Sequence, residues 1–295
     1  MKILHIGKFY YPSKGGIETV LKNLAEEQVR KGQQVTVLCF GNKGEEAVQD
    51  IEGVKVIRSG VFCTLFSQPL SFSLAFRIRN LVKSHDLIHV HLPNPLAEFI
   101  LTCLLITKPI IVSYHSDVVR QKLIYIFYKP FQMLFLRKVS KIVTATQAQI
   151  RFSKTLSNFP SKCTVVPYGV TLKEYVLTEK ISAQAVELKK KFGPYCLFVG
   201  RLVSYKGLEF LLEAMADAPL NLVVVGDGPL RSRLEDLAKS KTKNIYFVGQ
   251  VPGREQLFAY YEGCEIFILP SISVAEQFGM VMMEAIASPP GMVAS

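Results

Sequence analysis

Glu276 and Glu284 are the first side chains in this sequence whose types and spacing could do chemistry, because only seven residues separate the two carboxylates. The apolar run 266–271 before them is typical of a strand that ends in a loop, and the residues after Gly279 favour a helix. This pattern predicts that Glu276 lies in a strand-to-helix loop and that Phe278 and Gly279 lie at the helix start. Glu284 then lies about 9 Å further along the axis, with its side chain leaning back toward that start.

Two carboxylates and a helix start suit a ligand that carries both hydroxyls and phosphates. Backbone N–H groups in the first turn of a helix lack intrahelical partners and attract anions. One carboxylate could accept hydrogen bonds from sugar hydroxyls, the other from a second polyol, and the N–H groups could hold phosphates between them. That combination is a nucleotide sugar. The alternative is an ordinary amphipathic helix with two exposed glutamates, since carboxylates are favoured near any helix start.

Positive side chains occupy the corresponding place after an earlier strand. Arg201 and Lys206 follow the apolar strand expected at 196–200 and precede a helix. The planar guanidinium fork and the lysine ammonium both suit phosphate oxygens, so a pyrophosphate is the expected ligand. The alternative is a solvated basic loop. Gly228, in the Gly-Asp-Gly-Pro turn 226–229, also lies between a strand and a helix, although such a turn has little specificity on its own.

Gly15 and Gly16 close the loop after the first strand and open a helix. Glycine allows the backbone to approach a ligand closely, and a helix start adds positive potential. A simple loop-to-helix turn would contain the same residues. The pair is not part of a GxGxxG sequence, so the dinucleotide fingerprint is absent at this position.

Histidines give a third group of candidates. His115 ends the strand expected at 109–115, where a lone histidine is more often structural than functional. His89 and His91 alternate on an earlier strand and could be metal ligands at i and i+2. No carboxylate or cysteine cluster accompanies them, which favours a structural or acceptor-side role. The sequence also lacks an Asp-x-Asp pair for a metal-bound diphosphate, so positive charge must come from side chains and helix starts.

The elements that position these residues alternate between strand and helix, which implies parallel sheets covered by helices. In such folds ligands bind at the carboxyl ends of the strands. The pattern runs once over 1–175 and restarts over 176–295, with a hinge expected at 168–188. We therefore expect an α/β protein of two doubly wound, Rossmann-like domains that face each other across the site. The expected strands are 2–7, 35–40, 54–57, 87–91, 109–115, 142–146 and 164–166 in the first domain and 196–200, 222–226, 245–248 and 266–269 in the second.

Length and composition agree with this organisation. A chain of 295 residues with 49% apolar content suffices for two buried cores. The six cysteines form no CxxC pair and most lie in apolar runs, so we expect buried thiols of a reduced compartment. The N-terminal apolar run is too short for a signal peptide, and the longest apolar region, 99–114, is interrupted by Lys108 and Pro109. These features predict a cytoplasmic protein.

The net charge of +11 belongs to the first part of the chain. Residues 1–180 contain 24 Lys and Arg against 12 Asp and Glu, whereas residues 181–295 contain 11 against 12. A basic face suggests an anionic partner such as nucleic acid, a phosphorylated lipid or the membrane surface. Basic and aromatic residues are interleaved with apolar ones over 120–138, a stretch that suits either a core helix or an interfacial one. We favour the core helix.

Several of these short sequences together resemble the retaining GT-B glycosyltransferases of family 4. The resemblance rests on the paired glutamates in Ala-Glu-Gln-Phe-Gly…Glu-Ala, on Gly-Arg-Leu…Lys-Gly at 200–207, on Gly-Gly-x-Glu at 15–18, on His-x-Asp at 115–117 and on Gly-x-Gly-Pro at 226–229. It implies transfer of a sugar, such as a mannose-like hexose, from a UDP- or GDP-linked donor without a metal ion or other cofactor. The implied acceptor is a lipid-linked saccharide of a bacterial surface polysaccharide.

The resemblance also implies a role for each site residue. Arg201 and Lys206 would stabilise the departing diphosphate. Glu276 would bind hydroxyls of the donor sugar, and Glu284 would bind the ribose. His115 would contact the sugar from the opposite domain, so the first domain would be the acceptor side and the second would bind the nucleotide sugar. Further donor-binding positions are Gly15, Gly16, Gly228, Phe278 and Gly279. No nucleophile is evident, so displacement on the same face of the sugar, assisted by the leaving phosphate, is the expected mechanism.

The sequence departs from the family pattern at its end. After Glu284 the chain runs through Pro289-Pro290-Gly291 in place of the usual glycine turn and stops at Ser295. We therefore expect a truncated second domain that lacks its last strand or strands and the helix that crosses back to the first domain. Two other functions stay open: a Rossmann-type oxidoreductase, which the missing GxGxxG disfavours, and an inactive relative that binds a nucleotide or anionic lipid. We expect no nucleic-acid partner and a peripheral location at the inner face of the plasma membrane.

Overall fold

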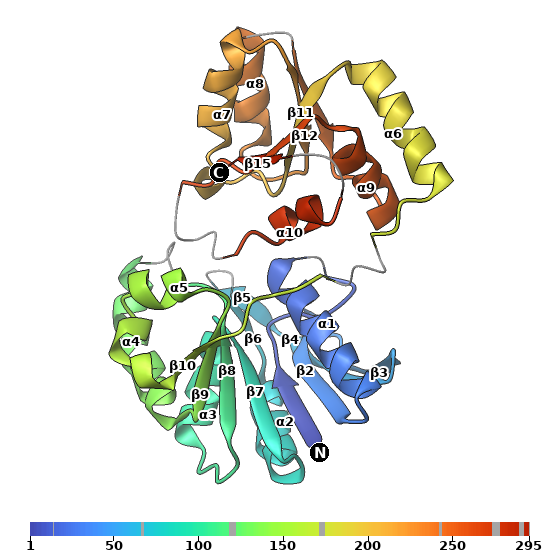
Figure 1. The fold of residues 1–295 in the computed structure, drawn as a ribbon. Helices are drawn as coiled ribbons and strands as arrows, with labels where there is room; N and C mark the ends of the chain where they lie inside the picture. Colours follow the sequence, from blue (N-terminus) through green and yellow to red (C-terminus); the bar gives the residue numbers. More distant parts are fainter. Residues whose placement is uncertain are drawn as a thin grey trace. The chain divides into compact units, whose positions relative to one another are not determined.

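The computed structural model describes residues 1–13, 15–65, 68–117, 122–170, 175–241, 244–272, 278–288 and 292–294. The chain forms two compact units, Met1–Pro167 and Tyr168–Ser295 (Figure 1). The division falls in the loop after the last strand of the first unit, ahead of the boundary predicted at 175.

The first unit is built on a sheet with the strand order β10-β9-β8-β7-β1-β2-β4-β3. β3 pairs with β4 in antiparallel fashion, and the other described pairings in this sheet are parallel. β5 and β6 form a separate antiparallel pair. The strands are β1 (Lys2–Ile6), β2 (Gln34–Lys43), β3 (Ala47–Ile51), β4 (Val54–Val61), β5 (Cys63–Leu65), β6 (Gln68–Leu70), β7 (Leu87–Leu92), β8 (Ile110–Tyr114), β9 (Lys141–Thr144) and β10 (Cys163–Val165).

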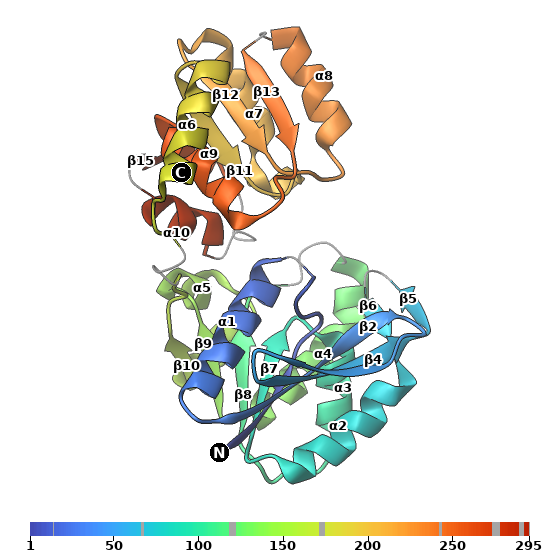
Figure 2. The same cartoon turned by 90° about the vertical axis from the view of Figure 1, so that its right-hand side faces the viewer.

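Helices cover both faces of this sheet, because successive side chains along each strand point to opposite faces. α1 packs on one face through Leu21 and Ala25. α2, α3 and α4 pack on the other face, so the sheet lies between α1 on one side and α2 and α3 on the other (Figure 2). The bounds are α1 (Gly16–Arg30), α2 (Phe72–Ser84), α3 (Pro95–Cys103), α4 (Lys122–Lys138) and α5 (Gln147–Phe152).

The second unit is built on a parallel sheet with the strand order β13-β12-β11-β14-β15. α7 and α8 cover one face, and α6, α9 and α10 cover the other. The strands are β11 (Tyr195–Val199), β12 (Asn221–Val225), β13 (Ile245–Gly249), β14 (Ile266–Ile268) and β15 (Met292–Ala294). The helices are α6 (Glu179–Phe192), α7 (Leu208–Ala214), α8 (Arg231–Lys241), α9 (Arg254–Gly263) and α10 (Met280–Ile286).

Two expectations about the second unit are wrong. Within the hinge predicted at 168–188, the chain forms helix α6 from Glu179 onward, because the apolar residues of that stretch have helical spacing. Ile181, Ala185 and Phe192 are buried, and the Thr178 hydroxyl caps the helix by accepting from the N–H of Ile181 at 3.3 Å. The second sheet also has a strand where the sequence predicts none, since β15 pairs in parallel with β14.

The six cysteines all lie in the described part of the chain and form no disulfide. The prediction that they are buried holds for Cys39, Cys196 and Cys264. It is wrong for Cys63 and Cys103, which are exposed in β5 and at the end of α3.

Candidate active site

The loops after β11 and β12 pack backbone against backbone at the carboxyl edge of the second sheet. A Cβ added to Gly226 would lie 2.0 Å from the carbonyl oxygen of Gly200, and one on Gly228 would lie 2.5 Å from the carbonyl oxygen of Leu202. The N–H of Leu202 donates to the carbonyl of Asp227 at 3.0 Å. The packing of the two loops therefore requires glycine at 226 and 228, independently of the donor-binding role predicted for Gly228.

Lys206 lies inside this loop cluster, whereas Arg201 is exposed. Lys206 is only 7% exposed, and its Nζ lies 3.7 Å from the point where a Cβ on Gly200 would stand. A Cβ on Gly207 would lie 2.0 Å from the carbonyl oxygen of Pro270, in the loop after β14. The loops after β12 and β14 thus both pack against the loop after β11, in which the Lys206 ammonium lies beside Gly200. A cation beside glycine backbone at the carboxyl ends of parallel strands suits a phosphate ligand.

Phe278 and Gly279 lie directly before α10, which begins at Met280. Gly279 has a φ of +63°, in the left-handed region that glycine adopts without strain. The ring of Phe278 meets that of Tyr168 edge-on, with the centroids 5.0 Å apart. Glu276, the first glutamate of the predicted pair, lies outside the described residues.

Glu284, the second glutamate of the pair, lies on α10 beside tyrosine hydroxyls. The hydroxyl of Tyr261 donates to its carboxylate at 3.3 Å. Burial raises the pKa of Glu284, and the Tyr261 hydroxyl, the charge of Arg254 and the Tyr175 hydroxyl each lower that pKa in part. The carboxylate therefore already accepts from hydroxyl groups, which is the chemistry that ribose binding would need.

Gly15 and Gly16 lie at the start of α1, where a carboxylate faces the helix N-terminus. A Cβ on Gly15 would lie 2.1 Å from Oε2 of Glu18, so the Glu18 side chain folds back over the first turn. Burial raises the pKa of Glu18, while its own backbone N–H and the charge of Lys8 lower it. A Cβ on Gly16 would meet no described atom within 4 Å, so the backbone is open to close approach there.

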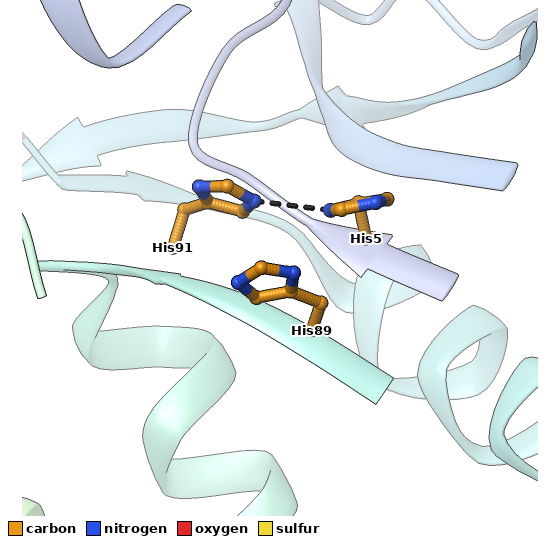
Figure 3. Close-up of side chains that lie close together, drawn as sticks. All are labelled: His5, His89 and His91. Atoms are coloured by element: carbon orange, nitrogen blue, oxygen red, sulfur yellow. Dashed lines mark hydrogen bonds between the residues drawn. The ribbon is translucent and has the colours of Figure 1, made fainter. Parts of the chain in front are cut away.

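Several imidazole side chains form a layer that ends at His115, the residue directly after β8. β1 pairs His5 with His89 of β7, and β7 pairs His91 with Ser113 of β8, all on the sheet face that α1 covers. His89 Nε2 lies 2.8 Å from Ser113 Oγ. His5 Nδ1 lies 3.1 Å from His91 Nε2 (Figure 3), and His91 Nδ1 lies 3.0 Å from His115 Nε2. The structure thus joins His115 to residues of two other strands by hydrogen bonds.

Burial keeps this layer neutral at pH 7. It lowers the pKa of His5 to about 4, although a hydrogen bond with Gln28 partly offsets the effect. It also lowers the pKa of His115 to about 4. The pKa values of His89 and His91 are lowered well below 6.5 by burial first and by neighbouring histidines second. Each imidazole therefore has one N–H to donate and one nitrogen to accept.

His5, His89 and His91 could in principle hold a metal ion, since their ligand atoms lie within 4.8 Å of one another. A bound metal lies in the plane of each imidazole, ~2.0 Å from the nitrogen. The rings of His89 and His91 are stacked, with centroids 4.7 Å and planes 21° apart, and His5 and His91 already share a hydrogen bond (Figure 3). Stacked rings direct their lone pairs along nearly parallel lines, so these rotamers suit a hydrogen-bonded layer better than a metal site.

The structure adds residues that the sequence analysis missed. His5 Nε2 lies 2.7 Å from Oε1 of Gln28 on α1, which extends the imidazole chain to a helix. Asn94, in the loop after β7, is fully buried, and neither atom of its side-chain amide has a hydrogen-bond partner among the residues that the structure describes. The alternating pair His89 and His91 is visible on β7, but His5 is a single histidine on β1 and its place beside them depends on the strand pairing. The sequence contains no comparable signal for Gln28 or Asn94.

Comparison with known proteins identifies the class to which this fold and site belong. Residues 14–174 match the family described as Glycosyltransferase Family 4, and residues 179–293 match Glycosyl transferases group 1. The O-antigen chain mannosyltransferase C of Escherichia coli is 30% identical over 287 residues, which cover 96% of this chain and 76% of that protein. The D-rhamnosyltransferase WbpZ of Pseudomonas aeruginosa is 31% identical over 288 residues, which cover 96% of this chain and 74% of that protein.

Solved structures show the same fold. Anabaena HepE in complex with UDP-glucose matches with a TM-score of 0.74 at 18% identity, over 100% of this chain and 80% of that chain. WaaG, a glycosyltransferase involved in lipopolysaccharide biosynthesis, matches with a TM-score of 0.71 at 18% identity, over 98% of this chain and 80% of that chain. The chain therefore has the GT-B fold with two Rossmann-like domains, as the sequence predicts. It belongs to glycosyltransferase family 4 and is a hexosyltransferase, so the oxidoreductase hypothesis is wrong.

Proposed function

We propose that this enzyme moves a mannose-like hexose from a UDP- or GDP-linked sugar to a lipid-linked saccharide during synthesis of a cell-surface polysaccharide. Support for the sugar and the pathway comes from the relatives named as an O-antigen mannosyltransferase and a rhamnosyltransferase. Support for the donor comes from structural neighbours solved with UDP and with UDP-glucose. The paired-glutamate resemblance supports transfer with retention of configuration.

The buried Lys206, in a strand-end loop against which two other strand-end loops pack, carries this proposal. As the bond between the sugar and the diphosphate breaks, negative charge develops on the leaving oxygen, and a cation held in place stabilises that charge without reorganisation. Lys206 is held by the packed loops, and the exposed guanidinium of Arg201 supplies a bidentate donor at the same strand end. With these two charges the transfer needs no metal ion. Glu284 binds the ribose hydroxyls and His115 contacts the sugar, as the family resemblance implies.

The test removes the two cations one at a time. Lys206→Ala and Arg201→Ala should each lower kcat by about 10²–10³-fold, the usual loss for one transition-state donor, and should weaken binding of UDP or GDP. Lys239→Ala is the matched control, because Lys239 is exposed on α8 and pairs with Asp236 at the surface. Circular dichroism should show all three variants folded. Unchanged transfer and nucleotide binding in both site variants would refute the assignment.

The donor and the stereochemistry need separate measurements. A thermal-shift screen of the wild-type chain against UDP-, GDP- and dTDP-linked sugars should show stabilisation by one nucleotide class, because only a ligand that binds the folded state raises the melting temperature. Nuclear magnetic resonance of the first-formed product should show the anomeric configuration of the donor. An inverted product would contradict retention while leaving the donor assignment intact.

We also propose that α4 contacts an anionic membrane surface, where a lipid-linked acceptor would lie. The prediction of a core helix holds for one face, on which Phe135 and Leu136 are buried. The other face exposes large apolar side chains, and Phe127 is 80% exposed. No described helix is long and apolar enough to cross a membrane. The exposed residues of α4 are Ile126, Phe127, Lys129, Pro130, Phe131, Leu134, Arg137 and Lys138.

Vesicle binding tests the α4 surface. The chain should sediment with vesicles that contain phosphatidylglycerol and should bind phosphatidylcholine vesicles more weakly, since basic residues add attraction to anionic lipid. Phe127→Ser should weaken binding about tenfold or more, because burying a Phe side chain is worth about 1.5–3 kcal/mol. Phe210→Ser on α7 is the matched control, as Phe210 is a comparably exposed phenylalanine of the other unit. Equal binding by the two variants would exclude α4 as the contact.

A further inference from the structure

Asp117 ends the His-x-Asp sequence after β8, and two buried hydroxyl groups hold its carboxylate. The hydroxyl of Tyr114 donates to Asp117 Oδ1 at 2.5 Å. The hydroxyl of Ser153, the residue directly after α5, donates to the same oxygen at 2.8 Å. Tyr114 and Ser153 are buried, whereas Asp117 is half-buried. One carboxylate oxygen is therefore fixed from two elements of the first unit, β8 and the segment after α5.

The surroundings of each hydroxyl settle the direction of these two hydrogen bonds. The Ser153 oxygen accepts the N–H groups of Thr155 and Leu156 at 3.3 and 3.2 Å. Its own hydrogen is left to donate to Asp117. Burial first, and the charge of Asp117 second, raise the pKa of Tyr114, so that its hydroxyl stays protonated at pH 7. Both hydroxyls therefore donate, and both donate to Oδ1.

Further hydrogen bonds fix the backbone just before this carboxylate. The Gln149 side chain of α5 donates to the carbonyl of Tyr114 at 2.5 Å and accepts the N–H of Ala145 at 3.1 Å, so it joins the ends of β8 and β9. The N–H of His115 donates to the carbonyl of Leu92 at 3.1 Å, which joins the ends of β8 and β7. The carboxylate thus follows a rigid strand end, and a group held in place loses little freedom when a ligand binds.

Holding these elements together does not require a carboxylate. An asparagine side-chain oxygen could accept the same two hydrogen bonds, because one such oxygen has two lone pairs. The carboxylate of Asp117 adds a second oxygen, Oδ2, and a negative charge that neither hydroxyl bond needs. It lies in the loop after β8, at the edge where ligands bind in doubly wound sheets. A carboxylate oxygen at that edge suits a ligand hydroxyl, since charged acceptors form the stronger hydrogen bonds.

We propose that Asp117 is an acceptor-binding residue, whose Oδ2 accepts a hydrogen bond from one hydroxyl of the saccharide acceptor. Tyr114 and Ser153 are positioning residues, since they hold the carboxylate without touching the saccharide. The assignment rests on the proposed function, in which the first unit takes the acceptor. It gives the last residue of the His-x-Asp sequence a role in acceptor recognition rather than in breaking the bond to the diphosphate.

The test measures transfer to a soluble probe, an α-linked mannose disaccharide, and to its monodeoxy analogues, each of which lacks one hydroxyl. Asp117→Asn keeps one oxygen for the two buried hydroxyls but replaces the second oxygen by an amino group that donates. It should raise KM for the disaccharide about tenfold to a hundredfold, the loss expected for one hydrogen bond to a charged group. The values of kcat and of KM for the nucleotide sugar should stay near those of the wild type.

The monodeoxy analogues separate ligand binding from a structural role. A site that hydrogen-bonds a hydroxyl discriminates against the analogue that lacks it, so the wild type should use one analogue about tenfold less well than the others. Asp117→Asn should lose that preference, because removing the hydroxyl costs nothing more once its acceptor is gone. Ser153→Ala removes one of the bonds that hold the carboxylate, so it should lower the melting temperature and keep the preference.

Asp50→Asn is the matched control and should change neither KM. Asp50 also uses one carboxylate oxygen within the fold, accepting the N–H of Gly53 at 3.0 Å, but it lies at the turn before β4, at the amino edge of the sheet.

An unchanged KM for the disaccharide in Asp117→Asn would overturn the assignment, and so would an equal loss with every analogue or a change confined to KM for the nucleotide sugar. If Asp117→Asn does not fold, Asp117→Ala gives the same comparison. A wild type that transfers sugar to none of these saccharides would refute the proposed function and the assignment together. An active wild type with an unaffected Asp117→Asn would refute the assignment alone.

Discussion

Acidification should destabilise the first unit selectively, because the chain places all its histidines there. They are His5, His85, His89, His91 and His115. Burial lowers the pKa values of His5, His89, His91 and His115. A histidine titrates near 6.5 in an unfolded chain, so at pH 5 the unfolded state binds protons that the folded layer does not. The stability contributed by each of these histidines is fully present above pH 6.5 and is lost as pH falls toward the folded pKa.

The size of this loss of stability follows from the pKa values of each group in the folded and in the unfolded state. With a folded pKa of about 4, His5 and His115 should each cost about 2 kcal/mol on going from pH 7 to pH 5. Burial also lowers the pKa values of His89 and His91, so protonation of these two side chains in the unfolded chain destabilises the first unit in the same direction. Glu98 acts in the opposite direction: burial raises its pKa to about 7, so its protonation adds about 2 kcal/mol over the same range. His5 and His115 together lose about 4 kcal/mol and Glu98 offsets about 2 kcal/mol, so these three groups give a net loss of about 2 kcal/mol, to which His89 and His91 add. The whole stability of a typical domain is about 5–15 kcal/mol.

Hydrogen exchange of the full chain, read by mass spectrometry at pH 7 and pH 5 and corrected for the intrinsic rate, reports opening of each unit separately. Peptides from β1, β7 and β8 should lose protection at pH 5, while those from β11 and β12 should keep it. The second unit is the internal control, since it has no histidine. In that unit the raised pKa of Glu284 stabilises the folded state as the pH falls. Equal loss of protection in the two units, or none in the first, would refute the reasoning.

Three further changes test the packing and the buried polar groups. Gly226→Ala should destabilise the second unit by about 2–4 kcal/mol in urea denaturation, because its φ is +130° and a Cβ would lie 2.0 Å from the carbonyl oxygen of Gly200. Gly16→Ala, with no described atom within 4 Å of the new Cβ, should be close to neutral and is the control. The stability contributed by the Glu98 carboxyl is lost as pH rises through about 7. The melting temperatures at pH 6 and pH 8.5 should therefore differ less in Glu98→Gln than in the wild type. Asn94→Leu should stabilise the chain by about 1–3 kcal/mol, since it removes an unpartnered buried amide, and an accompanying rise in KM for the acceptor would assign that amide to substrate binding.

The sequence predicts the alternation of strand and helix and the positions of the strand-end loops, because both depend on local patterns. Apolar strands followed by glycine or charged residues are visible without tertiary information, and Arg201, Lys206 and Gly228 are found in this way. Short elements with few apolar residues are harder to recognise. α6 has widely spaced apolar positions among many lysines, and its burial depends on contact with α9, about 70 residues further along the chain.

The imidazole layer shows why part of a site stays hidden in a sequence. His89 and His91 are visible as an alternating pair, but their partners depend on strand register. His5 meets His89 only because β1 pairs with β7, across more than 80 residues of chain. Gln28 joins them because α1 packs on that face. Neither the strand order nor the helix placement can be read from spacing alone.

A structural role alone does not explain why this face of the sheet is polar. The opposite face of the same strands is apolar, with Leu4 of β1 and Val90 of β7 in the core beneath α2, α3 and α4. Apolar side chains in place of the imidazoles would gain about 1.5–3 kcal/mol each on burial and would remove the acid sensitivity. The imidazoles instead form a series of hydrogen bonds that ends at the carboxyl edge of β8, the edge at which ligands bind in doubly wound sheets. The proposed contact of His115 with the sugar would account for the polarity of this face, and loss of stability in acid is the physical consequence of burying neutral imidazoles there.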